Sequence, residues 1–401
     1  PSHPYLKGLM AAVPHFDIVS LSPDDFVFSA LLMMTKHNKR RVAVKEGDRF
    51  VGIVEDIDVL SFLAGNSQLI PGRIDRASGV ADLAAAANDV EAQVRRLRRQ
   101  GVKAEMIAEI VSDLNRRLFA RTFEFTAHPD LRERACLIVM GSEGRGEQTM
   151  RTDQDNGLIL SEPVPEPMLN EFRESFTSAL ESFGFPPCPG NVMVRNPFWS
   201  RPLGEFVADF RSWVALPTPD AHMNVAIFYD ADAVAGRSEL LREAKTALIN
   251  TVRGERAYLA HFARAIDAFP TPIGFFRNLI TSEGAGDALD LKKGGVFPIV
   301  HGVRSLALEH GLMETGTDQR IMRLGEANVL KPEFARELSQ AFRYFTSLRL
   351  DSQITQTPGA SGTLTKPAEL SSMDRELLRD AFGVVKQFRD IIRRHFNLAM
   401  F

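Results

Sequence analysis

Apolar and polar residues follow two different periods along the chain, and the changes of period predict its elements. Residues 16–63 begin with a short strand-like apolar run (FDIVSLSP). A helical stretch (FVFSALLMMTKHN), two short strand-like runs (RRVAVKEG and RFVGIVE) and a second helical stretch (DIDVLSFLAG) follow. The pattern therefore predicts strand, helix, strand, strand and helix, in that order.

Two amphipathic helices are predicted between residues 72 and 130. The first has an apolar stripe at steps of three and four, and Gly101 ends it; the stripe is Leu83, Ala87, Val90, Val94 and Leu97. The second has the stripe Ile107, Ile110, Val111, Leu114 and Leu118. Arginines 95, 96, 98 and 99 either solvate the first helix or bind an anionic partner. We favour solvation, because a run of charge on a helix is usually exposed surface.

Residues 137–160 read LIVMGSEGRGEQTMRTDQDNGLIL, an apolar run, a Gly-Ser turn, and two aspartates that open a second apolar run. Side chains alternate along a strand, so Asp153 and Asp155 would project from one side and could share divalent cations. Their oxygens suit Mg²⁺, and paired ions can hold both oxygens of an in-line displacement at phosphorus. Gly141 and Ser142 could cradle phosphates. The stretch indicates nucleotidyl transfer; the alternative is a pair of solvated loop carboxylates.

The spacing of these residues carries a family resemblance. Gly141-Ser142 with Asp153-x-Asp155 resembles the nucleotidyltransferase superfamily of DNA polymerase β type. The string GSEGRGEQTMRTDQDN resembles the nucleotidyltransferase domain found beside CBS domains in bacterial signalling proteins, a relative of the nitrogen-regulation uridylyl- and adenylyltransferases. The resemblance implies an α+β fold: a single CBS motif (1–70), a helical linker (71–131), a polymerase β-like nucleotidyltransferase domain with a small mixed sheet (132–237) and a helical C-terminal domain (238–401).

The element order of residues 16–63 resembles one CBS motif. In that family the aspartate of a G-h-x-T/S-x-x-D segment holds the ribose of an adenosyl ligand, and Asp58 in GIVEDID (52–58) matches it. Glu55 stands where a hydroxyl is usual. Its charge would repel an anionic ligand, so we expect weak nucleotide binding here. CBS motifs usually pack in pairs, so we expect the mate upstream of Pro1 or in a second subunit of a homodimer.

The superfamily usually has a third carboxylate on a neighbouring strand. We take Asp230, which ends the apolar run 224–229, as this metal ligand or general base, with Asp232 and Asp209 as rivals. Arg145 and Arg151 are candidates to neutralise triphosphate charge; the alternative is an ion pair with Glu143 or Glu147.

Two later segments also resemble this group of families. The first is FGFPPCPGNVMVRNPFWSRPLGEF (183–206). One interpretation places Asn196 or Arg195 near the nucleotide, and the other makes the segment a structured turn that packs Trp199 against the sheet. We favour the second interpretation for Trp199. The second is LDLKKGG (289–295). Lys292 is expected either to reach the triphosphate from the helical domain or to be a lysine at the C-terminal end of a helix that the following glycines terminate. Further matches without assigned chemistry are Arg304, Thr315-x-Thr317, Arg320 and Arg349-x-x-x-Gln353. We expect His301 to be a packing histidine.

Composition narrows the function classes. The chain has 401 residues, enough for several domains, and its formal net charge of −3 argues against broad nucleic-acid binding. No apolar run reaches the ~18 residues of a membrane span and no signal pattern appears, so we expect a cytoplasmic protein. Two cysteines, Cys136 and Cys188, are too few for a disulfide framework or a thiolate zinc site, and both are expected to be buried. The chain starts at Pro1, so we expect a fragment.

Two function classes follow. The first is a nucleotidyltransferase dependent on Mg²⁺ (or Mn²⁺) that moves a nucleoside monophosphate from a nucleoside triphosphate to a hydroxyl acceptor, with a regulatory protein as a candidate acceptor and the CBS region as modulator. The second is a sensor that binds nucleotide without turnover. Intact Gly141, Ser142, Asp153 and Asp155 favour the first. A toxin–antitoxin nucleotidyltransferase is more distant, because such minimal domains usually lack a large helical partner.

Overall fold

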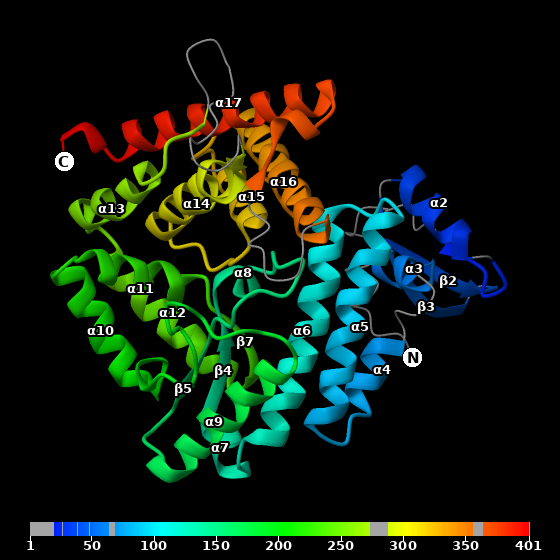
Figure 1. Cartoon of the computed structure of the whole chain (residues 1–401), viewed down its shortest axis with the longest axis horizontal. Helices are drawn as coiled ribbons and strands as arrows, with labels where there is room; N and C mark the ends of the chain where they lie inside the picture. The colour runs from blue at the N-terminus through cyan, green and yellow to red at the C-terminus, as the bar shows by residue number, and fades with distance from the viewer. Residues whose placement is uncertain are drawn as a thin grey trace, which may run out of the picture. The chain divides into compact units, whose positions relative to one another are not determined.

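The computed structural model describes residues 20–25, 27–37, 39–47, 49–63, 69–272, 288–355 and 364–400. The chain divides into two compact units, residues 1–69 and 70–401 (Figure 1). The predicted strand-like run that begins at Phe16 lies outside the described residues up to Val19.

Unit 1 is a small sheet with two helices. Its elements are β1 (Ser20–Leu21), α2 (Val27–His37), β2 (Arg41–Glu46), β3 (Arg49–Glu55) and α3 (Asp56–Leu63). The sheet order is β1-β2-β3, with β1 parallel and β3 antiparallel to β2. Its core is made by Ala30, Met34, Val42 and Val59. Within the described residues this confirms the predicted element order.

Unit 2 contains a small mixed sheet with the strand order β6-β5-β4-β7. The strands are β4 (Ala135–Val139), β5 (Asn156–Leu160), β6 (Ser200–Pro202) and β7 (Asp232–Gly236). Strands β5 and β7 run antiparallel to β4, and β6 runs parallel to β5. Every residue of β4 and β5 is buried, so both faces of the sheet are covered.

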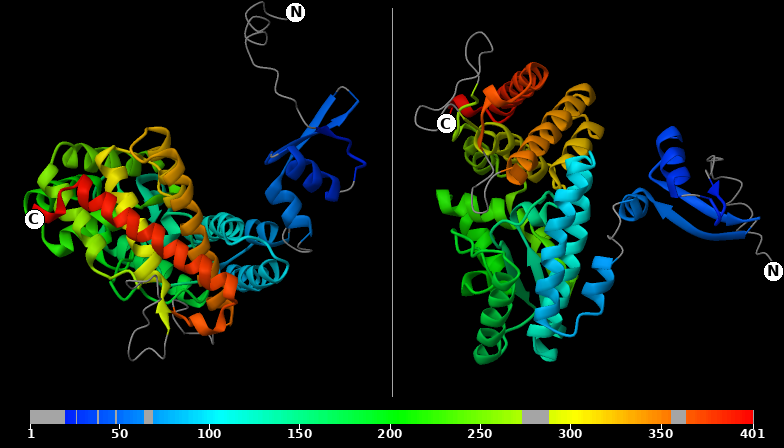
Figure 2. Two further views of the ribbon diagram at one scale, coloured as in Figure 1. Left: turned by 90° about the horizontal axis from the view of Figure 1, so that it is seen from above. Right: turned by 45° about the vertical axis from the view of Figure 1, so that its right-hand side comes forward.

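Two groups of helices cover this sheet (Figure 1). One group packs on β7 and on itself: α5 (Val80–Arg99), α6 (Ala104–Thr126) and α9 (Glu166–Ser182). The other consists of α10 (Leu203–Ala215), α11 (Pro219–Tyr229) and α12 (Ser238–Val252). Of these, α12 packs on β4, β5 and β7, and α10 packs on β6, α11 and α12. Figure 2 shows α5 and α6 side by side. Both predicted apolar stripes on α5 and α6 are buried.

The arginines of α5 neither project into solvent as a set nor form an open anion site. Arg98 donates from Nε and Nη2 to the two carboxylate oxygens of Asp351 at 2.6 Å each, and Arg95 donates to the carbonyl of Ile354 at 3.0 Å. These contacts fasten α5 to α16 (Pro332–Thr355). Neither solvation of the helix nor binding of an anionic partner, the two interpretations made from sequence, describes these contacts between helices. The partners lie about 250 residues away in the chain, so no local pattern indicated them.

Residues 224–229, expected to form a strand, belong to helix α11. Thr218 caps this helix, since its Oγ1 accepts from the Ala221 amide at 3.1 Å, and Pro219 stands at its first position. The buried residues Ala221, Val225 and Phe228 recur at steps of four and three, which is the helical period. Two residues, Asp230 and Ala231, separate this helix from the strand beside β4, which begins at Asp232.

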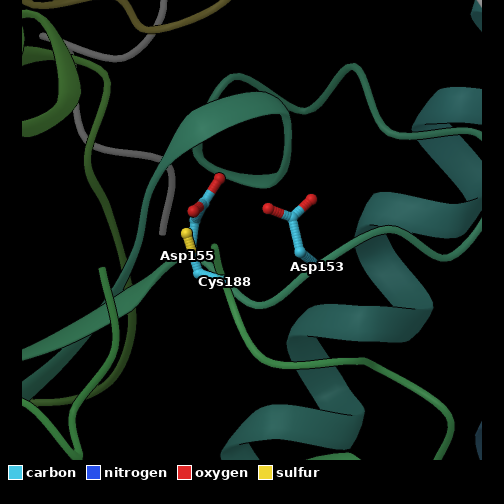
Figure 3. Close-up of side chains that lie close together, drawn as sticks. All are labelled: Asp153, Asp155 and Cys188. Carbon is cyan, nitrogen blue, oxygen red and sulfur yellow. The ribbon is translucent and has the colours of Figure 1, made fainter. Parts of the chain in front are cut away.

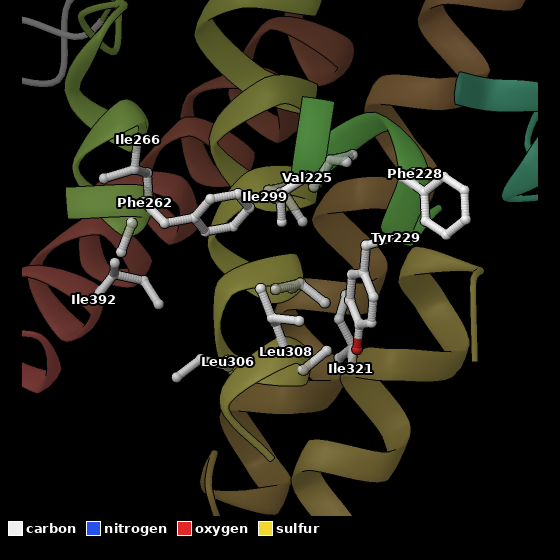
Figure 4. Packing of buried hydrophobic residues seen from close by; sticks show 14 of the residues in the cluster. Val225, Phe228, Tyr229, Phe262, Ile266, Ile299, Leu306, Leu308, Ile321 and Ile392 are labelled. Carbon is white, nitrogen blue, oxygen red and sulfur yellow. The ribbon is translucent and has the colours of Figure 1, made fainter. Parts of the chain in front are cut away.

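The C-terminal part is helical and shares the core of the sheet region. Its helices are α13 (Arg256–Ala263), α14 (Phe297–Glu309), α15 (Thr317–Glu326), α16 and α17 (Ser372–His395), with a two-residue pair of strands, β8 (Leu289–Asp290) and β9 (Leu364–Thr365). Figure 4 shows Val225 and Tyr229 of α11 packed among Ile299, Leu308 and Ile321. One continuous core therefore fixes the sheet against the helical part.

The remaining elements are short. They are α4 (Leu69–Asp75), α7 (Pro129–Arg134), α8 (Gly141–Gly144), a π-helical turn (Lys292–Val296) and 3₁₀ turns at Pro197–Trp199, Arg264–Asp267, Pro367–Glu369 and Leu398–Met400. Among the described residues, none of the helices combines the length and apolar character that a membrane crossing demands.

Candidate active site

The segment 153–156, which leads into β5, alternates between half-buried and buried side chains. Gln154 and Asn156 are 3% and 2% exposed and bind the loop 185–194. Gln154 Nε2 donates to the Phe185 carbonyl at 3.0 Å, and Asn156 Oδ1 accepts from the Val194 amide at 2.9 Å. Their backbone amides donate to the carbonyls of Pro186 and Val192 in the same loop. Because side chains alternate along an extended chain, Asp153 and Asp155 are directed away from these buried amides.

Asp153 and Asp155 come together as expected, but just ahead of the strand and not within it. A third potential ligand joins them. One ligand atom each of Asp153, Asp155 and Cys188 lie within 4.8 Å of one another (Figure 3). Cys188 is delivered by the loop that Gln154 and Asn156 hold. From the sequence we expected Cys188 to be a buried small residue, and we did not predict that it lies beside the two aspartates. The available signal was its position in the segment 183–206, which resembles the family.

Gly141 makes the position of Asp155 possible. Its φ of 59° lies in the left-handed region, and a Cβ there would overlap Oδ2 of Asp155. The Met140 amide donates to the Asp155 carbonyl at 2.8 Å, which fixes the aspartate beside the Gly141-Ser142 turn at the start of α8. The glycine, the serine and the two aspartates therefore meet at one end of the sheet.

Electrostatics at this end favour a bound cation. Burial raises the pKa of Asp155 to about 6, and the nearby Asp153 adds to the increase, whereas a hydrogen bond from Cys188 and the charges of Arg145 and Lys292 oppose it. Burial and the Asp155 charge raise the pKa of the Cys188 thiol to about 11. Two crowded carboxylates in a partly dehydrated site are stabilised by a divalent cation, and carboxylate oxygens are suitable ligands for Mg²⁺ or Mn²⁺.

Asp230 does not belong to this group. It is fully buried at the end of α11, and its oxygens accept from Arg145 at 2.8 Å, Arg320 at 2.7 Å and Arg304 at 2.5–3.2 Å. Although burial alone would raise its pKa, the three guanidinium groups hold the pKa of Asp230 well below its usual range. With both oxygens occupied, Asp230 is a structural ion-pair partner and not the expected third metal ligand.

The two rival aspartates are also engaged elsewhere. Asp232 pairs with Arg116 of α6, and Asp209 pairs with Arg201. Sequence reasoning missed that Arg304 and Arg320, noted only as family matches, serve to bury Asp230. A separation of more than 70 residues gave no local signal of this contact.

Arg145 and Arg151 form ion pairs and are not poised for a triphosphate. Arg145 Nε donates to Glu147 at 2.6 Å, the ion pair that we considered as its alternative, and its other end holds Asp230. Arg151 donates from Nε to Glu91 of α5 at 2.9 Å and from Nη1 to Asn88 at 3.1 Å. Both arginines therefore fix the segment 141–156 to its neighbours through ion pairs. The partner of Arg151 is Glu91, which the sequence did not suggest.

Lys292 remains a candidate for phosphate binding. It is exposed at the start of the π-helical turn, and its charge slightly opposes the rise in the pKa of Asp155. It does not end a helix, since the turn continues directly into α14. The following Gly294 and Gly295 serve packing, because a Cβ there would come within 2.6 Å of Pro272 and 2.8 Å of Phe345. The glycine-stop alternative is therefore wrong.

Arg349 on α16 is a second cation, and its electrostatic neighbours are Arg145, Glu147 and Asp290. Its Nε is buried and has no hydrogen-bond partner among the described residues. Burial and the charge of Arg145 lower its pKa, while Glu147 and Asp290 oppose the shift. Gln353, one turn later, accepts a hydrogen bond from Thr149 at 3.3 Å, so this face of α16 lies against the segment 141–156. Sequence reasoning noted the Arg349-x-x-x-Gln353 spacing without assigning it chemistry.

A pocket of about 150 Å³ is lined in part by residues 145–147. Its charged lining consists of Glu105, Glu109, Glu147, Asp318, Arg145 and Arg343. Four carboxylates against two guanidinium groups would repel a triphosphate. This pocket is therefore unfavourable for the phosphates of a nucleoside triphosphate.

The other residues considered from sequence have structural roles. Trp199 is 2% exposed and packs in the core, as expected. Arg195 pairs with Glu174 and Glu181, and Asn196 accepts from the Phe198 amide, so both belong to a structured turn. His301 is buried with both ring nitrogens in contact, with the Phe262 carbonyl at 2.7 Å and with Arg304 at 3.3 Å, as expected of a packing histidine.

Asp58 belongs to unit 1. Its Oδ2 accepts from the Glu55 amide at 2.9 Å at the start of α3, and Glu55 pairs with Arg41 at 2.8 Å. The local role of Asp58 is thus to bind the backbone just before its helix, and the repulsive charge of Glu55 is partly balanced by Arg41.

Family models match three parts of the chain. Residues 10–65 match the CBS domain, residues 88–220 match "Putative nucleotidyltransferase DUF294", and residues 256–396 match "Putative nucleotidyltransferase substrate binding domain". The second match contains the Asp153, Asp155 and Cys188 group, and the third contains Lys292 and Arg349. A comparison with curated proteins found no match.

Proposed function

The chain belongs to the family that links a CBS domain to a nucleotidyltransferase domain, and from this premise we propose that it is a Mg²⁺- or Mn²⁺-dependent enzyme. It would transfer a nucleoside monophosphate from a nucleoside triphosphate to a hydroxyl acceptor. The observation that supports this best is the close approach of Asp153 and Asp155 beside the Gly141-Ser142 turn.

Asp153 and Asp155 would hold the divalent cation, which supplies positive charge to the phosphate oxygens. Gly141 contributes by leaving space for the Asp155 carboxylate. Ser142 starts the turn next to this pair and offers a hydroxyl and a backbone amide to a phosphate oxygen. The shared core of the sheet and the helical part keeps these groups in one rigid frame.

Lys292 and Arg349 are proposed to bind the β- and γ-phosphates from the helical part. In the transfer, the acceptor oxygen forms a bond to the α-phosphorus, the bond from that phosphorus to the bridging oxygen breaks, and pyrophosphate leaves with the electron pair. The acceptor's proton passes to solvent or to a carboxylate of the site. Cations near the leaving pyrophosphate stabilise the charge that develops there.

One observation favours a second function, a sensor that binds nucleotide without turnover. No third carboxylate joins Asp153 and Asp155 among the described residues, and Asp230 is held by three arginines. A site without a third acidic group lacks an obvious general base for the acceptor. Regulation by the CBS region fits either function, whereas a protein acceptor fits only the transferase.

The test is to incubate the protein with each labelled nucleoside triphosphate, Mg²⁺ or Mn²⁺, and a cell extract, and to search for a labelled acceptor. We expect a label with the unaltered chain and a loss of about a thousandfold with Asp153→Asn and Asp155→Asn. Asp113→Asn, which removes an exposed carboxylate on α6, is the matched control. Nucleotide binding without any label would favour the sensor. Equal labelling by the double variant would contradict the assignment.

A further inference from the structure

Cys188 occupies the place beside Asp155 where a third metal ligand would stand. Figure 3 shows its sulfur next to the Asp155 carboxylate, with Asp153 facing them from across the site. Two atoms can bind the same ion only if their separation is no more than about twice the metal–ligand bond length. The ligand atoms of Asp153, Asp155 and Cys188 lie within 4.8 Å of one another, which is close to that limit. A small side-chain rotation would place two oxygens and one sulfur around one cation.

The thiol is held in place by its own loop. The Cys188 carbonyl accepts from the Asn191 amide at 2.9 Å, and the Cys188 amide contacts the Met193 sulfur at 3.3 Å. The loop is fixed to the aspartate segment by Gln154 and Asn156, which are both buried. Cys188 therefore reaches the carboxylates through a pre-formed loop, and its backbone does not have to rearrange.

We propose that Asp153, Asp155 and Cys188 form a mixed oxygen and sulfur site that binds thiophilic divalent cations such as Zn²⁺ or Cd²⁺ more tightly than Mg²⁺. The inference deepens the proposed function, because such an ion would displace Mg²⁺ and inhibit transfer. Thiolate is a soft ligand that selects Zn²⁺ and its heavier relatives, whereas Mg²⁺ demands oxygen ligands. On binding, the S–H bond breaks, the sulfur–metal bond forms, and the proton passes to the buffer.

The experiment is a titration of the whole chain with Cd²⁺ in the absence of nucleotide, followed by the ultraviolet charge-transfer band of a cadmium–thiolate bond and by calorimetry. The variants are Cys188→Ser and Asp155→Asn. Cys136→Ala is the matched control, because Cys136 is the other cysteine and is buried in β4. Circular dichroism of each variant checks its fold.

We expect a saturable band with one Cd²⁺ per chain in the unaltered protein and in Cys136→Ala. Cys188→Ser should lose the band and bind Cd²⁺ and Zn²⁺ about 10- to 100-fold more weakly, with Mg²⁺ affinity little changed. A band that persists in folded Cys188→Ser, or that never appears in the unaltered chain, would overturn the proposal. Since no nucleotide is present, the outcome is independent of whether the chain catalyses transfer.

Discussion

Oδ2 of Asp155 lies where a side chain at Gly141 would have to stand. The close approach of the Asp155 carboxylate therefore requires a residue without a side chain at position 141. The backbone there also favours glycine, because its φ of 59° lies in the left-handed region. The turn and the aspartates are separated by more than ten residues in sequence, yet they lie against one another at one end of the sheet.

Gly141→Ala should therefore abolish divalent-cation binding by displacing Asp155. Gly254→Ala is the matched control, since Gly254 has a φ of 85° but no atom lies within 4 Å of the point that its Cβ would occupy. Both variants should lose about 1–2 kcal/mol of unfolding free energy from backbone strain, measured in urea. Only Gly141→Ala should lose Mn²⁺ affinity in calorimetry. Unchanged affinity in that variant would show that Asp155 is not a ligand.

Lys292→Ala and Arg349→Ala should each weaken nucleoside triphosphate binding by about tenfold, because each removes a charge-assisted contact with phosphate. Monophosphate binding should change much less, since only the triphosphate extends toward these cations. Calorimetry with both ligands measures the difference. Lys293→Ala, which removes a lysine paired with Asp290, and Arg336→Ala, at an exposed position on α16, are the controls. Equal losses for both nucleotides would return the two residues to structural roles.

Asp230→Asn should lower the unfolding free energy at neutral pH by about 3–5 kcal/mol, because three buried guanidinium groups would lose their shared anion. The pKa of Asp230 is depressed in the folded chain, so its contribution is present above the ordinary carboxyl pKa and is lost as the pH falls through the folded value. Urea unfolding checks this. Asp390→Asn, at an exposed pair on α17, should cost less than about 1 kcal/mol. Similar losses in the two variants would contradict the assignment of a buried ion cluster.

Glu143→Gln should stabilise the protein above neutral pH. Burial raises the pKa of Glu143 to about 7, against a hydrogen bond from Asn115 and the charge of Arg116. A raised carboxyl pKa gives stability that is full below about pH 4.5 and is lost as the pH rises through about 7. The variant should match the unaltered chain near pH 4 and gain up to about 3 kcal/mol near pH 8.

Thermal unfolding at the two pH values measures the gain from Glu143→Gln. Glu326→Gln, an exposed glutamate on α15, controls for the loss of a surface charge and should show no such change with pH. A constant difference between Glu143→Gln and the unaltered chain across this range would show that the carboxyl does not ionise as inferred.

The amino-acid sequence determined the local features of this protein. The two periods predicted the CBS-like element order and the stripes of α5 and α6. The alternation of Asp153, Gln154, Asp155 and Asn156 placed both aspartates on one side, because extended backbone imposes that geometry wherever the segment lies. The apolar run before Asp230 was misread as a strand. Its capping Thr218 and Pro219 were local signals of a helix that outweighed the likeness to a family strand.

Tertiary structure decided which charged and ligating groups meet. Cys188 reaches the aspartates through a loop held by buried amides, and Arg304 and Arg320 cross from the helical part to bury Asp230. The same holds for Arg98 with Asp351 and for Arg151 with Glu91. Residue type and spacing identify which side chains are able to pair, but burial and three-dimensional proximity select the partner, because electrostatic attraction depends on distance and local dielectric and not on separation along the chain.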